Sequence, residues 1–208
     1  ANPSAGFSIV SYSSASNAVT VAHGLNAAPK LIIVKDRNNA HDWVVITTLL
    51  ANTTDYLVLN SDAASANFGG DAPTSTTFIP SQSSNSDYVA YCFSPVESYS
   101  AMGSYVGNGS ADGPFVFTGF KVAWLMIKQT DAVDGWMIYD KKRNTFNVAN
   151  SRLEANVNNA EFTDNVIGLD FLSNGFKFRS SDNDFNGSGG TYIYLAFASN
   201  PFKTSRAR

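Results

Sequence analysis

The stretch GGTYIYLAFASNPF, residues 189–202, decides the fold, because the chain has already used nearly the same pattern in SDYVAYCFSPV, residues 86–96. Each stretch opens an alternating apolar run on a Tyr, ends it on a Phe and places a Pro a few residues later. Alternation with a period of two and enrichment in Tyr, Phe, Val and Ile are typical of β-strands. The recurrence indicates an internal duplication of a β-rich unit.

The duplication extends outward from these two strands in the same order in both halves. KLIIVK (30–35) is followed by the seven residues DRNNAHD and then by WVVI, while AWLMIK (123–128) is followed by the seven residues QTDAVDG and then by WMIY. Each half therefore has an apolar run ending in Lys, a polar loop of equal length and a Trp that opens the next run. Shorter matches pair residues 9–14 with 103–108, 23–25 with 118–120 and 57–64 with 153–160.

These landmarks predict two repeats, a first at 7–99 and a second at 103–204, which we expect to pack as one compact unit. Short apolar runs separated by Gly, Asn and Asp turns favour antiparallel sheets over helices. The predicted fold class is all-β, with two similar antiparallel β-sandwich or barrel-like units related by a pseudo-twofold axis. The unbroken runs LIIV and WLMI are expected in central strands.

The strand assignments follow the apolar runs, and the segment LEANVNNAEF (153–162) could instead form a short helix. Strands are expected near 7–12, 31–35, 43–47, 56–60, 87–94, 103–107, 114–118, 123–128, 136–140, 166–171, 174–179 and 190–198.

Composition excludes several classes of function. The formal net charge is −3, with scattered Lys and Arg, so the chain lacks the basic face that nucleic acid binding requires. No apolar stretch approaches the roughly 20 residues that a bilayer needs, so we expect no membrane insertion. The single cysteine, Cys92, cannot form an internal disulfide, and its place in YVAYCF predicts a buried residue and not a nucleophile.

The two seven-residue loops are the candidate ligand-binding sites. Carboxylates and amides hydrogen-bond to sugar hydroxyls, and an aromatic face covers the apolar side of a sugar ring. Each Trp competes with a role in the core because it opens a strand, and each loop could be only a solvated turn. The candidate residues are Asp36, Asn38, Asp42 and Trp43 in the first loop, and Asp131, Asp134 and Trp136 in the second.

The motif DNDFNG (182–187) matches the opening D-x-D-x-N-G of a calcium loop. Asp182, Asp184 and Asn186 are accordingly candidate metal ligands for calcium, and apart from this possible calcium ion the sequence predicts no cofactor. The twelfth position is Ile193, so the usual bidentate Glu is absent. The alternative is a polar hairpin tip without a metal.

Catalytic patterns are sparse, so the sequence predicts a protein that is not an enzyme. The two histidines, His23 and His41, fall in different parts of the first repeat, and no G-x-S-x-G motif is present. Glycoside hydrolysis needs two carboxylates about 5 to 10 Å apart. Asp140 and Asp170, at predicted strand ends, are the only plausible pair.

The phrases GSYVGNGSADGPFVFTGFKVAWLMIK, FLSNGFKFR and GGTYIYLAFASNPFK resemble the C-terminal module of predicted tail-fibre and other virion proteins of tailed bacteriophages. The likeness covers nearly the whole chain from about Gly6. In those proteins the module commonly follows a concanavalin-like lectin domain. The family supplies no catalytic or binding residues to carry over.

The resemblance implies a domain of a tail fibre or head fibre, made in the host cytoplasm and placed on the virion surface. Its expected partners are a host cell-surface glycan or protein, other virion proteins and two further copies in a homotrimer. Three functions stay open at this point: a receptor-binding module, a structural virion domain without a ligand, and a polysaccharide hydrolase.

Overall fold

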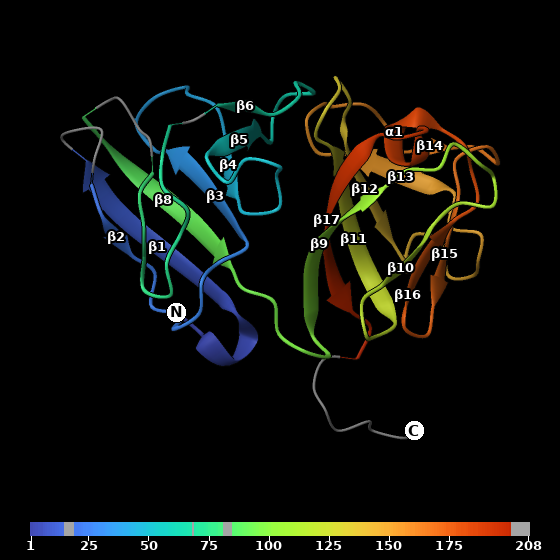
Figure 1. Cartoon of the computed structure of the whole chain (residues 1–208), viewed down its shortest axis with the longest axis horizontal. Coiled ribbons are helices and arrows are strands. Elements are labelled where there is room, and N and C mark those ends of the chain that lie inside the picture. Colours follow the sequence, from blue (N-terminus) through green and yellow to red (C-terminus); the bar gives the residue numbers. More distant parts are fainter. Residues whose placement is uncertain (15–18, 68, 81–84, 201–208) are drawn as a thin grey trace. The chain divides into compact units, whose positions relative to one another are not determined.

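The computed structural model describes residues 1–14, 19–67, 69–80 and 85–200 of the chain (Figure 1). The described residues form antiparallel sheets with one short 3-10 helix and one short α-helix, which confirms the predicted all-β class. The chain divides into two compact units, and the second begins at Glu97. Among the described helices, none is long and apolar enough to cross a membrane. The packing of the two units against each other, and a pseudo-twofold axis between them, stay predictions.

Unit 1 consists of a six-stranded sheet and a two-stranded one. The large sheet has the order β1, β8, β3, β4, β5, β6, and the small sheet pairs β2 with β7. The elements are η1 (Pro3–Ala5), β1 (Phe7–Ser14), β2 (Val21–Ala22), β3 (Leu31–Asp36), β4 (Val44–Thr47), β5 (Asp55–Val58), β6 (Ala66–Asn67), β7 (Thr77–Phe78) and β8 (Ser86–Phe93).

Unit 2 has a six-stranded sheet of the same plan and a larger second sheet. The order β9, β17, β11, β12, β13, β14 matches that of unit 1 strand for strand, and the second sheet has the order β10, β16, β15. The elements are β9 (Ser100–Val106), β10 (Phe115–Phe117), β11 (Val122–Gln129), β12 (Trp136–Asp140), β13 (Ser151–Glu154), β14 (Phe162–Thr163), β15 (Leu169–Leu172), β16 (Gly175–Phe178), α1 (Asn183–Asn186) and β17 (Thr191–Ala198).

The Tyr that opens each duplicated strand has the same neighbour in both units. Tyr88 on β8 stacks on Tyr12 of β1, with ring centroids 5.3 Å apart, and Tyr192 on β17 stacks on Tyr105 of β9 at 5.0 Å. Both are direct cross-strand pairs. Offset or parallel stacking of this kind adds to the burial energy of the rings. Tyr12 therefore corresponds to Tyr105, one residue away from the match that the sequence predicted for this strand.

The Trp that opens β12, and the Trp that precedes β4, are held by the same hydrogen bond. Asn60 accepts from the backbone N–H of Trp43 through its Oδ1 at 2.8 Å, and Asn156 accepts from that of Trp136 at 2.8 Å. The preceding Lys also repeats. Lys35 donates from Nζ to the carbonyl of the next residue at 2.8 Å, and Lys128 does so at 2.6 Å. The duplication thus reaches individual hydrogen bonds around both seven-residue loops.

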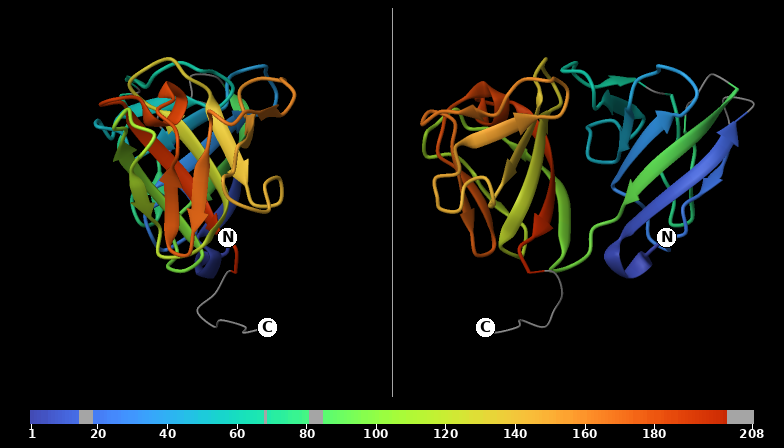
Figure 2. Two further views of the ribbon diagram at one scale, coloured as in Figure 1. Left: turned by 90° about the vertical axis from the view of Figure 1, so that its right-hand side faces the viewer. Right: turned by 180° about the vertical axis from the view of Figure 1, so that it is seen from behind.

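Each core lies between the large sheet and the small one. Unit 2 is a β-sandwich, because β10, β15 and β16 form a layer that faces β11, β12 and β17 (Figure 2). Side chains from both layers make up its core. In unit 1, Val21 and Phe78 of the two-stranded sheet pack on Ile32 and Val34 of β3. Cys92 belongs to this core and is fully buried, as predicted, and burial raises the pKa of its thiol to about 12.

The sequence mispredicted one segment and missed the shortest strands. Residues 153–162 are not helical: β13 occupies the start of the segment and β14 begins at its end. Pairing of β13 with β12 satisfies backbone groups that a local helical pattern would otherwise satisfy. Five strands of two to four residues, β2, β6, β7, β13 and β14, carry too few residues to show a period.

Candidate functional site

The first seven-residue loop closes around a buried carboxylate. Asp36, at the end of β3, accepts hydrogen bonds from the backbone N–H groups of Asn38 and Asn39, from the Asn39 amide and from the Ser86 hydroxyl. His41 Nδ1 lies 2.9 Å from Asp36 Oδ2. Burial alone would raise the pKa of Asp36, but the hydrogen bonds from Ser86 and Asn39 outweigh it and hold the pKa far below its usual range.

The other candidates of this loop also contact the protein itself. The amide of Asn38 donates to Asp87, and Asp42 accepts from the Asn60 amide at 2.9 Å. Trp43 is half-buried, and its ring stacks on that of Tyr91 with centroids 6.4 Å apart. The loop's carboxylates therefore stabilise its own conformation, and its Trp is only partly exposed.

The second loop differs in the position of its carboxylates. Asp131 holds the loop to β17, because its Oδ2 accepts from the Thr191 backbone N–H at 2.9 Å and its Oδ1 from the Gln129 amide. Asp134 accepts a hydrogen bond from the backbone N–H of the adjacent Gly135 at 2.7 Å. Trp136 is only 1% exposed, so its ring belongs to the interior and does not face a ligand.

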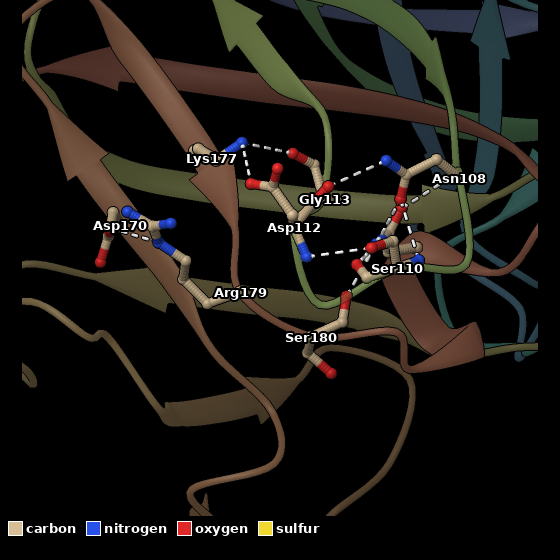
Figure 3. Close-up of polar contacts among 9 residues, drawn as sticks. Asn108, Ser110, Asp112, Gly113, Asp170, Lys177, Arg179 and Ser180 are labelled. Carbon is tan, nitrogen blue, oxygen red and sulfur yellow. Dashed lines mark hydrogen bonds and ion pairs between the residues drawn. The ribbon is translucent and has the colours of Figure 1, made fainter.

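The motif DNDFNG forms α1 and its caps. Asp182 is the N-cap and accepts from the backbone N–H of Asp184 at 2.9 Å. Asn186 is fully buried, and its Oδ1 accepts from the backbone N–H of Asn108 at 2.9 Å. Its amide nitrogen donates to the carbonyls of Ser180 and Ser110, which tie α1 to the neighbouring loop (Figure 3).

These bonds bear directly on the predicted calcium site. The side-chain oxygen of Asn186 is already used by a backbone N–H, and Asp182 caps a helix in place of facing a central ion. Within the described ranges, no group of three or more Asp, Glu, His or Cys side chains is placed to hold a metal ion. The side chains of Asp182 and Asn186 thus have hydrogen-bonding roles within the fold, and the Asp184 carboxylate forms an ion pair with Arg152.

A cavity of about 350 Å³ brings the second loop and α1 together at one end of unit 2. This size is within the usual range for small-molecule sites. The second loop follows β11, and α1 precedes β17. Because β11 pairs with β17, the two motifs meet although they are distant in sequence. The polar lining comes from Gln129, Asp134, Asn183, Asp184 and Ser188, and the rest from Ala132, Val133, Gly187 and Gly190.

The two carboxylates of this cavity have raised pKa values. Burial, reinforced by the charge of Asp184, raises the pKa of Asp134 to about 6. Burial also raises the pKa of Asp184, although the Arg152 guanidinium opposes the shift. Arg152 Nη1 lies 2.6 Å from Asp184 Oδ2. Two half-buried carboxylates facing one cavity are the clearest electrostatic feature of the unit.

Arg152 is the residue of this site that the sequence did not reveal. It is 9% exposed and lies on β13, in a segment whose sequence carried no strand pattern. Its guanidinium also lies 5.2 Å from the centre of the Phe162 ring. No local motif links an Arg at 152 to an Asp at 184, so only the folded sheet identifies the pair.

The remaining catalytic candidates are engaged elsewhere. The His23 side chain is buried and its Nδ1 accepts from the Leu25 backbone N–H. Asp140 accepts from the Arg143 side chain at 3.2 Å, and Asp170 from that of Arg179 at 2.6 Å, as Figure 3 shows for the second pair. The two carboxylates that the sequence paired are therefore each bound to a different arginine.

The fold and the cavity define a class: a duplicated, all-β protein with a polar cavity at one end of its second unit. A family model described as Domain of unknown function (DUF7483) matches residues 1–201, and the chain belongs to that family. No curated protein and no solved structure gives a significant match.

Proposed function

We propose that the chain is a domain of a bacteriophage tail fibre or head fibre that binds glycans on the host cell surface. The observation that carries the proposal is the cavity between the second loop and α1, where five polar side chains converge. The resemblance of both repeats to virion appendage proteins supports the proposed location in a tail fibre or head fibre. One weak site per copy is sufficient in this setting, because many copies on one particle bind together with high avidity.

The cavity lining suits neutral sugars. The carboxylates of Asp134 and Asp184 accept hydrogen bonds from sugar hydroxyls, and the amides of Gln129 and Asn183 can donate or accept. The Val133 side chain is 72% exposed at the cavity and offers an apolar contact to one face of a ring. The ion pair with Arg152 fixes the orientation of the Asp184 carboxylate.

A glycan array followed by calorimetric titration tests the proposal. We expect binding of neutral glycans with a Kd near the millimolar range, and a loss of about tenfold in Asp134→Asn. Asp71→Asn, an exposed aspartate of unit 1, is the matched control and leaves binding unchanged. Absence of binding to every sugar by a folded sample would favour a structural virion domain.

The pH dependence offers a second readout. The pKa of Asp134 is about 6, so lowering the pH from 7.5 to 5 protonates this carboxylate and removes its charge. Glycan affinity is expected to fall over that interval in the wild type and to fall less in Asp134→Asn, where only Asp184 of the two cavity carboxylates still titrates. A wild-type affinity that does not change with pH would contradict the role of this residue.

One observation favours a hydrolase as the second candidate. Asp134, with its pKa near 6, could donate a proton to a leaving group while Asp184 acts as the second carboxylate. Such activity would require protonated Asp134 and so would increase as the pH falls to 6, opposite to the binding profile. Release of reducing ends from host polysaccharides, abolished in Asp134→Asn, would favour this candidate over the adhesin.

A further inference from the structure

A second cavity, of about 340 Å³, lies at the other end of the β11–β12 pair. Lys121 directly precedes β11, and Lys141 and Lys142 directly follow β12, whereas the loop 129–135 joins the opposite ends of the two strands. The backbone N–H of Lys141 donates to the Ala123 carbonyl at 2.9 Å, which extends the pairing of the two strands to this point. Three lysines from two adjacent strands thus line one cavity.

The loop that carries the cavity is held at both of its ends. Asn147 binds the backbone of Phe171 on β15 with both amide atoms, at 3.1 Å and 2.9 Å. At the other end, Asp140 accepts from the backbone N–H groups of Lys142 and Arg143. The backbone that carries the lysines is therefore already held in place and needs little ordering when a ligand binds, which favours affinity.

The charge of these lysines is not neutralised by the protein. Within the part of the chain that the structure describes, no carboxylate forms an ion pair with Lys121, Lys141 or Lys142. The nearby acids Asp140 and Glu161 are both paired with Arg143. Burial, together with the charges of Lys142 and Lys121, lowers the pKa of Lys141. An anion placed between the lysines would relieve this repulsion.

An aromatic ring accompanies the positive charge. Phe146 lines the same cavity and is 85% exposed, the largest exposed fraction among the large apolar residues described as exposed. Thr145, next to it, is exposed and also lines the cavity. A flat apolar face beside cations and a hydroxyl is the combination that a charged sugar ring requires, because one face of the ring is apolar and its substituents are polar.

We propose that this cavity binds an anionic saccharide, one that carries a carboxylate or a phosphate on the ring. Lys121, Lys141 and Lys142 bind the anionic group, and Phe146 packs against the ring. The inference rests on the proposed function and assigns a ligand class to a second site of the same domain. A long polyanion such as single-stranded nucleic acid is disfavoured by the formal net charge of −3 and by the small volume of the site, about 340 Å³.

Calorimetric titrations with four probes test the proposal: an alginate oligosaccharide, a neutral mannose oligosaccharide of the same length, mannose 6-phosphate and inorganic phosphate. We expect at least one of the two charged sugars to bind about tenfold more tightly than the neutral sugar at low salt. Lys141→Gln and Lys142→Gln should each weaken that binding about fivefold or more, and Phe146→Ala should weaken it as well. Lys30→Gln, an exposed lysine of unit 1, is the matched control.

The outcomes separate this proposal from the first one. Neutral sugars that bind at the Asp134 cavity, with no gain for either charged sugar, would overturn the second site and leave the proposed function intact. Charged sugars that bind and lose affinity in the lysine variants, without any neutral binding, would support the second site and contradict the first. Inorganic phosphate that binds as tightly as the charged sugars would overturn the saccharide assignment.

Discussion

The loops 36–42 and 129–135 occupy the same place in two copies of one fold, yet their carboxylates do different things. Both loops follow a Lys that donates to the next carbonyl and precede a Trp whose N–H is held by an Asn. In unit 1 the carboxylate of Asp36 is buried inside the loop and receives several donors. In unit 2 that position is Gln129, and Asp134 faces a cavity shared with α1. The hydrogen bonds that flank the two loops are thus the same, whereas Asp36 is buried inside its loop and Asp134 faces a cavity.

The largest expected effect is the loss of the buried carboxylate in unit 1. Asp36→Ala leaves the donors of Asn38, Asn39 and Ser86 without their acceptor, so we expect the free energy of unfolding of unit 1 to fall by about 2 to 4 kcal/mol. Urea denaturation followed by circular dichroism measures it. Asp71→Ala, at an exposed position, should change stability by less than about 0.5 kcal/mol. Equal effects of the two substitutions would contradict the structural role of Asp36.

A matched pair of substitutions tests the hydrogen bond from Asn to the Trp that follows each loop. Asn60→Ala and Asn156→Ala each remove the acceptor of a Trp backbone N–H, at Trp43 and Trp136 respectively. Each should cost about 1 kcal/mol, and the cost should be greater at Asn156 because Trp136 is buried. Thermal unfolding of the two variants checks this. A loss of stability in only one of the two variants would show that the two Asn–Trp hydrogen bonds are not energetically equivalent.

A smaller effect, with the opposite sign, is expected at Asp134. Because the folded pKa is raised to about 6, ionisation of this carboxylate costs stability at pH 7.5, and the cost disappears as the pH falls below the unfolded value near 3.8. Allowing for partial exposure, Asp134→Asn should raise the free energy of unfolding by about 1 kcal/mol at pH 7.5.

Differential scanning calorimetry at two pH values measures the Asp134 effect. The gain in Asp134→Asn should be absent near pH 3, below the unfolded pKa of 3.8, where the wild-type carboxylate is mostly protonated in both states. Asp36 has the opposite sign: its lowered pKa contributes stability above pH 3.8 that is lost as the pH falls further. A variant that loses stability at pH 7.5 would show that the Asp134 carboxylate is favourably bound and not poised for a ligand.

The sequence was sufficient to predict the central strands and the Lys and Trp that flank each loop, but not the difference between the two loops. Period-two runs and the repeated Lys, loop and Trp pattern locate the central strands, because strand and turn preferences are local. The sequence ranked Asp36 and Asp134 alike. Their difference arises from Ser86 on β8, which donates to Asp36, and from Asp184 on α1, whose charge adds to the effect of burial in raising the pKa of Asp134. Both residues are distant from the loops in sequence, so only the folded sheets bring them there. Trp43 and Trp136 show the same limit, since both open a run and only Trp136 is fully buried.

The most direct test of the account is a two-dimensional nitrogen–proton spectrum of the protein, titrated with neutral mono- and disaccharides at millimolar concentrations. The account predicts shifts of the backbone amides of Asn183, Ser188 and Gly190, which line the unit 2 cavity, while the amides of Asn38 and Asn39 stay in place. Shifts confined to the unit 1 loop, or no shifts at any sugar concentration, would contradict the proposal that the second loop, and not the first, binds a ligand.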